Sequence, residues 1–129
     1  MISPEKRPRG TGAAGKAGED LAASSLERAG YDILCRNYRC RHGELDIVAR
    51  EGRHLVFVEV KSRRSLRFGE PHEAIDSRKR RRMSRAALHY LQHHGGTEQD
   101  ARFDVLFVRF TAGGGTEIRL IRNAFEVCP

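Results

Sequence analysis

Two acids and a lysine stand close together in the middle of the chain, in segments that otherwise read as strands. Asp46 ends Gly43-Glu44-Leu45-Asp46, and Glu59 and Lys61 follow after a short polar turn, in the run over residues 55–62. Alternate residues of a strand share a face, so Glu59 and Lys61 should point one way and the intervening valines the other. Charge is costly to bury without a partner, so an apolar strand would carry these side chains for a chemical reason.

Carboxylates on two neighbouring strands, with a lysine two residues beyond one of them, suit metal-dependent hydrolysis of a phosphodiester. The acids would hold a hard cation such as Mg²⁺ through oxygen, and the lysine would steady an attacking hydroxide or the charged phosphorane. The structural alternative is the solvated face of an edge strand, on which an acid and a lysine alternate and partly pair. Glu44 shares the expected face of Asp46, or it pairs with a nearby arginine.

The charge of the chain points to an anionic partner. The 129 residues carry a formal net charge of +7, and residues 60–90 alone hold ten lysines and arginines against three acids. Basic clustering beside carboxylates suits a polyanion that lies over the acidic residues. A solvated basic face that keeps the protein in solution is the alternative.

Size and composition predict one domain without a membrane partner. Residues 1–12 combine proline, glycine and basic residues without an apolar period, which predicts a flexible basic N-terminal arm ahead of a single domain over residues 13–129. No apolar run approaches membrane-spanning length. Three cysteines without a signal peptide favour free thiols and a cytoplasmic location. Zinc is disfavoured, because Cys35, Cys40 and His42 lack the second half of a ligand set.

Hydrophobic periodicity predicts the element order α-β-β-β-α-β-β. Helices are expected over residues 13–29 and 77–93, the first ended by Gly30. Strands are expected over residues 31–38, 45–50, 55–62, 103–110 and 117–122. The first of these strands should place Tyr31, Ile33 and Cys35 on one face.

The second helix has two chemically different sides. Its apolar stripe runs from Met83 to Leu91 at helical spacing. Lys79 falls on this apolar side, one turn before Met83, so it should point toward the sheet or else snorkel past its edge. An outward basic face is expected from Arg78, Arg81, Arg82 and Arg85. Solvent exposure rather than metal binding is expected for His89, His93 and His94.

Together these segments resemble the YraN-like family of small bacterial proteins. The resemblance is carried by Gly18-Glu19, Asn37-Tyr38-Arg39-Cys40-Arg41, Gly43-Glu44-Leu45-Asp46, Val56-Phe57-Val58-Glu59-Val60-Lys61-Ser62-Arg63, Phe68-Gly69, Arg78-Lys79, Arg102-Phe103-Asp104-Val105 and Asn123-Ala124-Phe125. It spans residues 15–125, and the long central pair of motifs is its most specific part. That family is similar in turn to the PD-(D/E)xK nuclease superfamily, in particular to Holliday-junction resolvases and restriction-endonuclease-like folds.

The resemblance implies an α/β fold with a restriction-endonuclease-like core, α-β-β-β-α-β, and a mixed central sheet flanked by helices. It implies metal-binding acids at Asp46 and Glu59, a catalytic lysine at Lys61 and a further carboxylate at Glu19 that would tune the site. With the main-chain carbonyl of Val60 as an added ligand, the expected cofactor is Mg²⁺ or Mn²⁺.

The expected function is a metal-dependent endonuclease that hydrolyses phosphodiester bonds of DNA, including branched or repair intermediates. Phosphates would be held by basic residues of the loop before the second helix and of that helix, namely Arg63, Arg64, Arg67, Arg78, Lys79, Arg81, Arg82 and Arg85. A homodimer would suit a junction substrate, because resolving a junction needs two sites related by symmetry. The alternative is a non-catalytic nucleic-acid-binding accessory protein of a DNA repair, recombination or uptake assembly.

Overall fold

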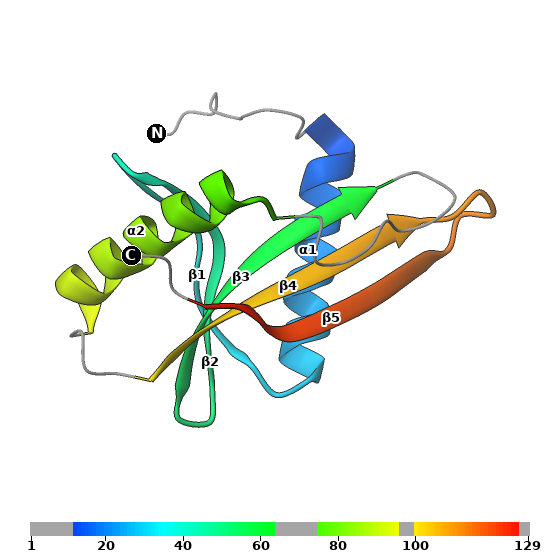
Figure 1. Cartoon of the computed structure of the whole chain (residues 1–129). Coiled ribbons are helices and arrows are strands. Elements are labelled where there is room, and N and C mark those ends of the chain that lie inside the picture. Colours follow the sequence, from blue (N-terminus) through cyan, green and yellow to red (C-terminus); the bar gives the residue numbers. More distant parts are fainter. Residues whose placement is uncertain (1–11, 64–74, 96–99, 127–129) are drawn as a thin grey trace.

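In the part of the chain that the structure describes, one mixed sheet of five strands is flanked by two helices (Figure 1). The computed structural model describes residues 12–63, 75–95 and 100–126. Its elements are α1 (Gly12–Arg28), β1 (Asp32–Cys40), β2 (Gly43–Glu51), β3 (His54–Arg63), α2 (Ser77–His94), β4 (Ala101–Phe110) and β5 (Thr116–Phe125). The expected α/β class, the order α-β-β-β-α-β and the mixed sheet between helices are confirmed.

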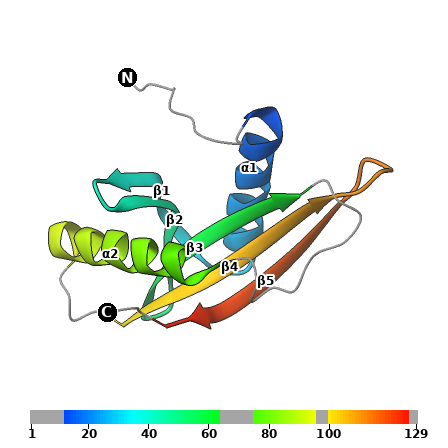
Figure 2. The ribbon, with the colours of Figure 1, turned by 45° about the horizontal axis from the view of Figure 1, so that its top comes forward.

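The order of strands in the sheet follows the order in the chain, from β1 to β5. β1, β2 and β3 form an antiparallel meander, β4 joins β3 in parallel after the α2 crossover, and β5 returns antiparallel (Figure 2). The β2–β3 ladder ends at the pair Ile47–Val58, whereas β3 stays paired with β4 as far as Arg63. Within the described residues, the second half of β3 therefore has β4 as its only ladder partner.

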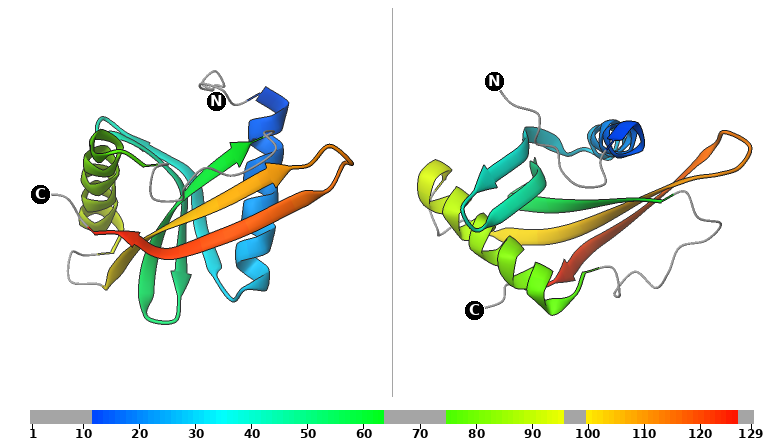
Figure 3. Two further views of the ribbon diagram at one scale, coloured as in Figure 1. Left: turned by 45° about the vertical axis from the view of Figure 1, so that its right-hand side comes forward. Right: turned by 90° about the horizontal axis from the view of Figure 1, so that it is seen from above.

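Each face of the sheet is covered by one helix and has its own apolar cluster (Figure 3). The cluster under α2 includes Phe57, Met83, Tyr90, Phe103 and Phe107. The cluster under α1 includes Leu26, Tyr31, Val56, Val58 and Leu106. Successive residues of β3 and β4 thus enter opposite clusters, as the period of two in a strand requires.

Helix α1 lies tightly against β3. At Gly18, which is buried, a Cβ atom would stand 1.8 Å from Oγ of Ser62, so a larger residue would require Ser62 to move. The helix ends as predicted at Gly30, whose φ of 98° lies in the left-handed region. The Gly30 and Tyr31 N–H groups donate to the carbonyls of Glu27 and Leu26 at 3.1 and 2.9 Å, which is the Schellman pattern.

Helix α2 begins at an N-cap and buries the side that its spacing predicted. The carboxylate of Asp76 accepts a hydrogen bond from the N–H of Lys79 at 2.9 Å. The predicted apolar stripe is buried, at Met83, Ala86, Ala87, Tyr90 and Leu91. The predicted outward face is exposed, at Arg78, Arg81, Arg82 and Arg85.

One expectation for β1 is wrong. Ile33 packs in the cluster under α1, but Cys35 packs in the cluster under α2. The cause is a shift of register between these two residues, which inserts an extra residue and reverses the faces beyond it. Cys35 and Cys40 are free thiols, as expected.

Several expectations fall outside the described residues. These are the arm, apart from Gly12, the arginines at 64 and 67, Phe68-Gly69 and Cys128. Arg63 is described as the last residue of β3, without its side chain. In the described ranges, neither helix has the length and apolar character needed to cross a membrane.

Candidate active site

Asp46 lies where β2 parts from β3. Its Oδ2 accepts a hydrogen bond from the main-chain N–H of Val60 at 2.8 Å, beyond the last β2–β3 pair. Face alternation breaks here, because Leu45 packs under α2 whereas Ile47 packs under α1. Residues two apart in a regular strand would share a face. Asp46 therefore projects along the sheet toward β3 rather than onto either face.

Glu59 is a buried carboxylate on the neighbouring strand, with a side chain that is 4% exposed. Its Oε2 lies 2.9 Å from Nζ of Lys79 and 3.7 Å from Nζ of Lys61. The predictions that Glu59 and Lys61 share a face and that Lys79 points toward the sheet are thus confirmed. The solvated edge strand is ruled out, since β3 is an interior strand and Glu59 is buried.

The two carboxylates are electrostatically unfavourable neighbours. Burial raises the pKa of Asp46 well above its ordinary value, and the charge of Glu59 raises this pKa further. The N–H of Val60 and the ammonium of Lys79 act in the opposite direction. Positive charge placed between the carboxylates would therefore stabilise both in their ionised form.

The residues present fit a hard divalent cation. Asp46 and Glu59 offer carboxylate oxygens from adjacent strands, and the N–H and C=O groups of one strand residue face the same neighbour, so the carbonyl of Val60 lies on the side of Asp46. Over the described ranges, no three His, Cys, Asp or Glu side chains converge on one metal position. Two carboxylates, a carbonyl and water suit Mg²⁺, which keeps several waters when it binds proteins.

Glu19 stands beside this pair rather than within it. Its Oε1 accepts a hydrogen bond from Nδ2 of Asn37 at 3.4 Å and lies 3.7 Å from the guanidinium of Arg36. Asn37 has a φ of 57°, the left-handed conformation that asparagine tolerates. The charge of Glu19 still contributes to the raised pKa of Asp46. Glu19 is thus placed to tune Asp46 from α1.

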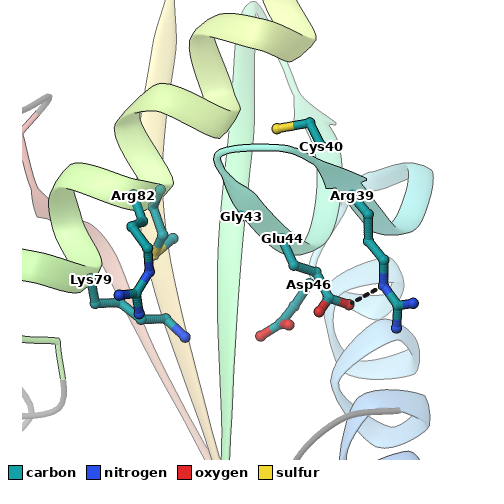
Figure 4. A pocket seen from close by; sticks show the side chains of 8 residues that line it. Arg39, Cys40, Gly43, Glu44, Asp46, Lys79 and Arg82 are labelled. Atoms are coloured by element: carbon teal, nitrogen blue, oxygen red, sulfur yellow. Dashed lines mark ion pairs between the residues drawn. The ribbon is translucent and has the colours of Figure 1, made fainter. Parts of the chain in front are cut away.

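A cavity of about 310 Å³ opens over Asp46, between the end of the β1–β2 hairpin and the first turns of α2 (Figure 4). Its walls are formed by Arg39, Cys40, Gly43, Glu44, Lys79, Arg82 and Met83. Nε of Arg39 lies 3.4 Å from the carboxylate of Glu44, so Glu44 has the arginine partner that was its alternative role. The cavity therefore presents cations from two separate elements around the half-buried carboxylate of Asp46.

The basic residues assigned to phosphate binding fall into two groups. Lys79 and Arg82 line the cavity, and Arg78, Arg81 and Arg85 continue the exposed basic face along α2. The side chain of Arg63 and all of residues 64 and 67 lie outside the described part of the chain. The position of Arg39 at the cavity was not predicted, although it belongs to the Asn37-to-Arg41 motif.

A second buried acid, Asp104, has an architectural role that the sequence pattern did not reveal. Its carboxylate is fully buried and accepts hydrogen bonds from the Tyr31 hydroxyl at 2.8 Å, from Nε of Arg102 at 2.9 Å and from the N–H of Asn123 at 2.9 Å. The last bond lies beside the register shift between β4 and β5. The network ties Tyr31, which follows α1, to β4 and β5, and it includes residues of the Arg102-to-Val105 and Asn123-to-Phe125 motifs.

The histidines of α2 differ among themselves. His93 and His94 are exposed, as expected. His89 is half-buried instead, with Nδ1 2.6 Å from the hydroxyl of Tyr38. This contact ties α2 to β1, so His89 is part of the packing between them.

The family model that matches this chain and two relatives about 50% identical to it have the same family description. A family model described as "Uncharacterised protein family UPF0102" matches residues 18–108, which confirms the YraN-like resemblance. UPF0102 protein GSU0650 of Geobacter sulfurreducens is 50% identical over 113 residues, which cover 88% of each chain. A UPF0102 protein of Syntrophus aciditrophicus is 51% identical over 113 residues, again 88% of each chain. The structure of Pyrococcus furiosus SfsA in complex with Ca²⁺ is similar at a TM-score of 0.42 and 18% identity, over 88% of this chain and 64% of that chain.

Proposed function

We propose that this chain, which belongs to the uncharacterised protein family UPF0102, is a metal-dependent endonuclease that hydrolyses phosphodiester bonds of DNA. One observation carries the proposal. The half-buried Asp46 and the buried Glu59 lie on two neighbouring strands that part at this point, with Lys61 and Lys79 close to Glu59. Two carboxylates and two ammonium groups gathered beneath a basic cavity are suited to binding a metal and a phosphate group. They are poorly suited to a purely structural role.

The two acids have the role of holding the cation. Asp46 and Glu59, with the carbonyl of Val60, would bind Mg²⁺ or Mn²⁺, which supplies Lewis acidity toward the phosphate when bound. Asp46 is held for this by the N–H of Val60, which fixes its carboxylate between the strands. Glu19 would act on Asp46 through its charge.

Lys61 has the role of orienting the attacking water and stabilising negative charge in the transition state. It follows Glu59 on the same face of β3, and its side chain is 25% exposed, so it is open to a substrate. A positive group that is already in place needs no reorganisation when charge develops on the phosphate.

The surface around the cavity supports DNA as the proposed substrate class. The exposed arginines of α2 would bind phosphates of the DNA backbone, which gives affinity and register without reading sequence. Branched or repair intermediates are included because the sequence motifs resemble those of Holliday-junction resolvases, and a homodimer would serve such a substrate.

A second candidate is a nucleic-acid-binding accessory protein without hydrolysis. The observation in its favour is the Lys79–Glu59 ion pair at 2.9 Å, which compensates the buried acid without any metal. Both candidates require the basic face, but only the nuclease requires Asp46, Glu59 and Lys61 together.

A cleavage assay separates the two candidates. Purified protein is incubated with single-stranded, duplex, flapped and four-way-junction DNA in Mg²⁺, Mn²⁺, Ca²⁺ or EDTA, and binding is followed in parallel by fluorescence anisotropy. We expect cleavage of at least one DNA in Mg²⁺ or Mn²⁺ and none in EDTA. Binding of these DNAs without cleavage in either metal would favour the accessory protein.

A further inference from the structure

The cation nearest to Glu59 comes from the helix, not from the strand. Nζ of Lys79 lies 2.9 Å from Oε2, against 3.7 Å for Lys61. Only the shorter of these distances is that of a charge-assisted hydrogen bond. Figure 4 shows the Lys79 side chain extending from α2 toward Asp46, and its charge lowers the pKa of Asp46. Lys79 thus acts on both carboxylates.

Lys79 stands where a lysine is otherwise unfavourable. It lies in the first turn of α2, in which there is no acid, and the positive end of the helix dipole repels a cation there. Its main chain is fixed, because its N–H donates to the Asp76 cap. The side chain is 30% exposed, so it can leave Glu59 for the cavity without unfolding the helix.

We propose that Lys79 is a built-in competitor of the divalent cation: its ammonium neutralises Glu59 in the metal-free protein and is displaced from Glu59 when the metal binds. The inference rests on the proposed metal site. A positive side chain and a divalent cation cannot both take the same buried carboxylate oxygen at close range without mutual repulsion. Displaced, Lys79 remains in the wall of the cavity that also contains Arg82.

Removal of the competitor should have opposite effects with and without metal. In Lys79→Met the metal-free protein loses the partner of a buried charge, so its melting temperature falls. The same variant binds Mn²⁺ more tightly, because no ammonium has to leave Glu59. At a given Mn²⁺ concentration c a lower Kd stabilises the folded state more, by RT ln(1 + c/Kd), so the rise of melting temperature with Mn²⁺ should exceed that of wild type.

The matched control is Arg82→Met, which removes a positive charge from the same cavity wall and leaves the Lys79–Glu59 ion pair in place. It measures the general effect of a reduced positive charge on Mn²⁺ affinity. Lys79→Arg keeps the charge and should retain the competition. Because Lys79→Arg keeps the positive charge beside Glu59, it can be tested even if Lys79→Met does not fold. Tighter Mn²⁺ binding by Lys79→Arg than by wild type would then contradict the competition.

The experiment is calorimetric titration of each protein with Mn²⁺, with a thermal melt at each metal concentration. We expect Lys79→Met to bind Mn²⁺ about tenfold more tightly than Arg82→Met, and Lys79→Arg to bind no more tightly than wild type. Equal affinities of Lys79→Met and Arg82→Met, or of Lys79→Arg and Lys79→Met, would overturn the competition. Absence of Mn²⁺ binding in every protein would overturn the metal site itself. Tightened Mn²⁺ binding without any DNA cleavage would overturn the nuclease and leave the competition standing.

Discussion

The carboxylate of Asp46 accepts a hydrogen bond from the main-chain N–H of Val60 at 2.8 Å, in the region where β2 no longer pairs with β3. A side chain thereby satisfies a strand donor that a regular ladder would pair with a carbonyl. The consequence is chemical as well as structural. Asp46 is fixed between two strands, beside Glu59.

Asp46→Asn should stabilise the metal-free protein near neutral pH. Burial and the charge of Glu59 raise the pKa of Asp46 in the folded state, so ionised Asp46 opposes folding. Between the ordinary and the raised pKa the folded protein holds the extra proton, and wild-type stability falls as pH rises through that window. The amide oxygen of asparagine can still accept the hydrogen bond from the N–H of Val60, but the side chain carries no charge.

Urea unfolding at several pH values tests this. The difference in unfolding free energy between Asp46→Asn and wild type should be largest at neutral pH. It should shrink as the pH falls toward the ordinary carboxyl pKa. Asp32→Asn, at an exposed aspartate of β1, is the control and should show little difference. A less stable Asp46→Asn at neutral pH would mean that the acid is a structural element.

Lys61→Ala should reduce the cleavage rate by about two orders of magnitude or more and change Mn²⁺ affinity only a few-fold. The loss of one preorganised group that stabilises transition-state charge typically has an effect of this size. Metal binding is spared because Lys61 is the more distant of the two lysines at Glu59. Single-turnover cleavage and calorimetry give the two quantities, and a parallel loss of both would make Lys61 an architectural partner of Glu59.

Replacement of Arg81 and Arg85 by glutamine should weaken the salt dependence of DNA binding. Each arginine that binds a phosphate releases counterions, so the slope of log affinity against log salt should fall by about one unit for each such arginine replaced. The effect should be similar on unrelated sequences. Fluorescence anisotropy in Ca²⁺ at several salt concentrations measures the slope.

The control for the arginine pair is the double replacement of Arg53 and Arg119 by glutamine. Both are exposed and lie on the β2–β3 turn and on β5, away from α2. This variant has the same loss of charge and should keep the wild-type slope. If both double variants lower the slope equally, the basic face of α2 has no special part in binding.

Gly18→Ala should destabilise the protein by about 1–3 kcal/mol, although alanine is the better helix former, because overpacking dominates at close contacts. The added Cβ would stand 1.8 Å from Oγ of Ser62 and 3.0 Å from its Cβ. Ser62→Ala removes the nearer atom, so it should partly rescue Gly18→Ala in a double-mutant cycle of unfolding free energies. If the changes in unfolding free energy of the two substitutions are additive, Gly18 and Ser62 are not in close contact at this point of the α1–β3 packing.

Much of the fold could be predicted because its local signals agree. The alternation in β3 gave the shared face of Glu59 and Lys61, and the 100° spacing of α2 gave the inward direction of Lys79. Gly30 marked the end of α1 because helices commonly end at a residue in the left-handed conformation, which glycine adopts most easily. These signals act over a few residues, within one element.

The parts that could not be predicted depend on contacts between elements. Strict alternation fails at Asp46 and between Ile33 and Cys35, where the strands shift or part. The sequence also gives no measure of whether Lys61 or Lys79 lies nearer to Glu59, because the two come from different elements. Asp104 read as an ordinary strand residue for the same reason, since its partners are distant in the chain.

The most direct test of a hydrolytic site at Asp46 is the single-turnover rate of DNA cleavage in Mn²⁺ by wild type, Asp46→Asn and Asp32→Asn. Asp46→Asn has the same size as wild type, keeps an acceptor for Val60 and removes one anionic ligand. We predict cleavage by wild type and Asp32→Asn at similar rates, and a loss of at least about 10²-fold in Asp46→Asn. Cleavage by Asp46→Asn at the wild-type rate would contradict a metal-dependent site at the parting of β2 and β3.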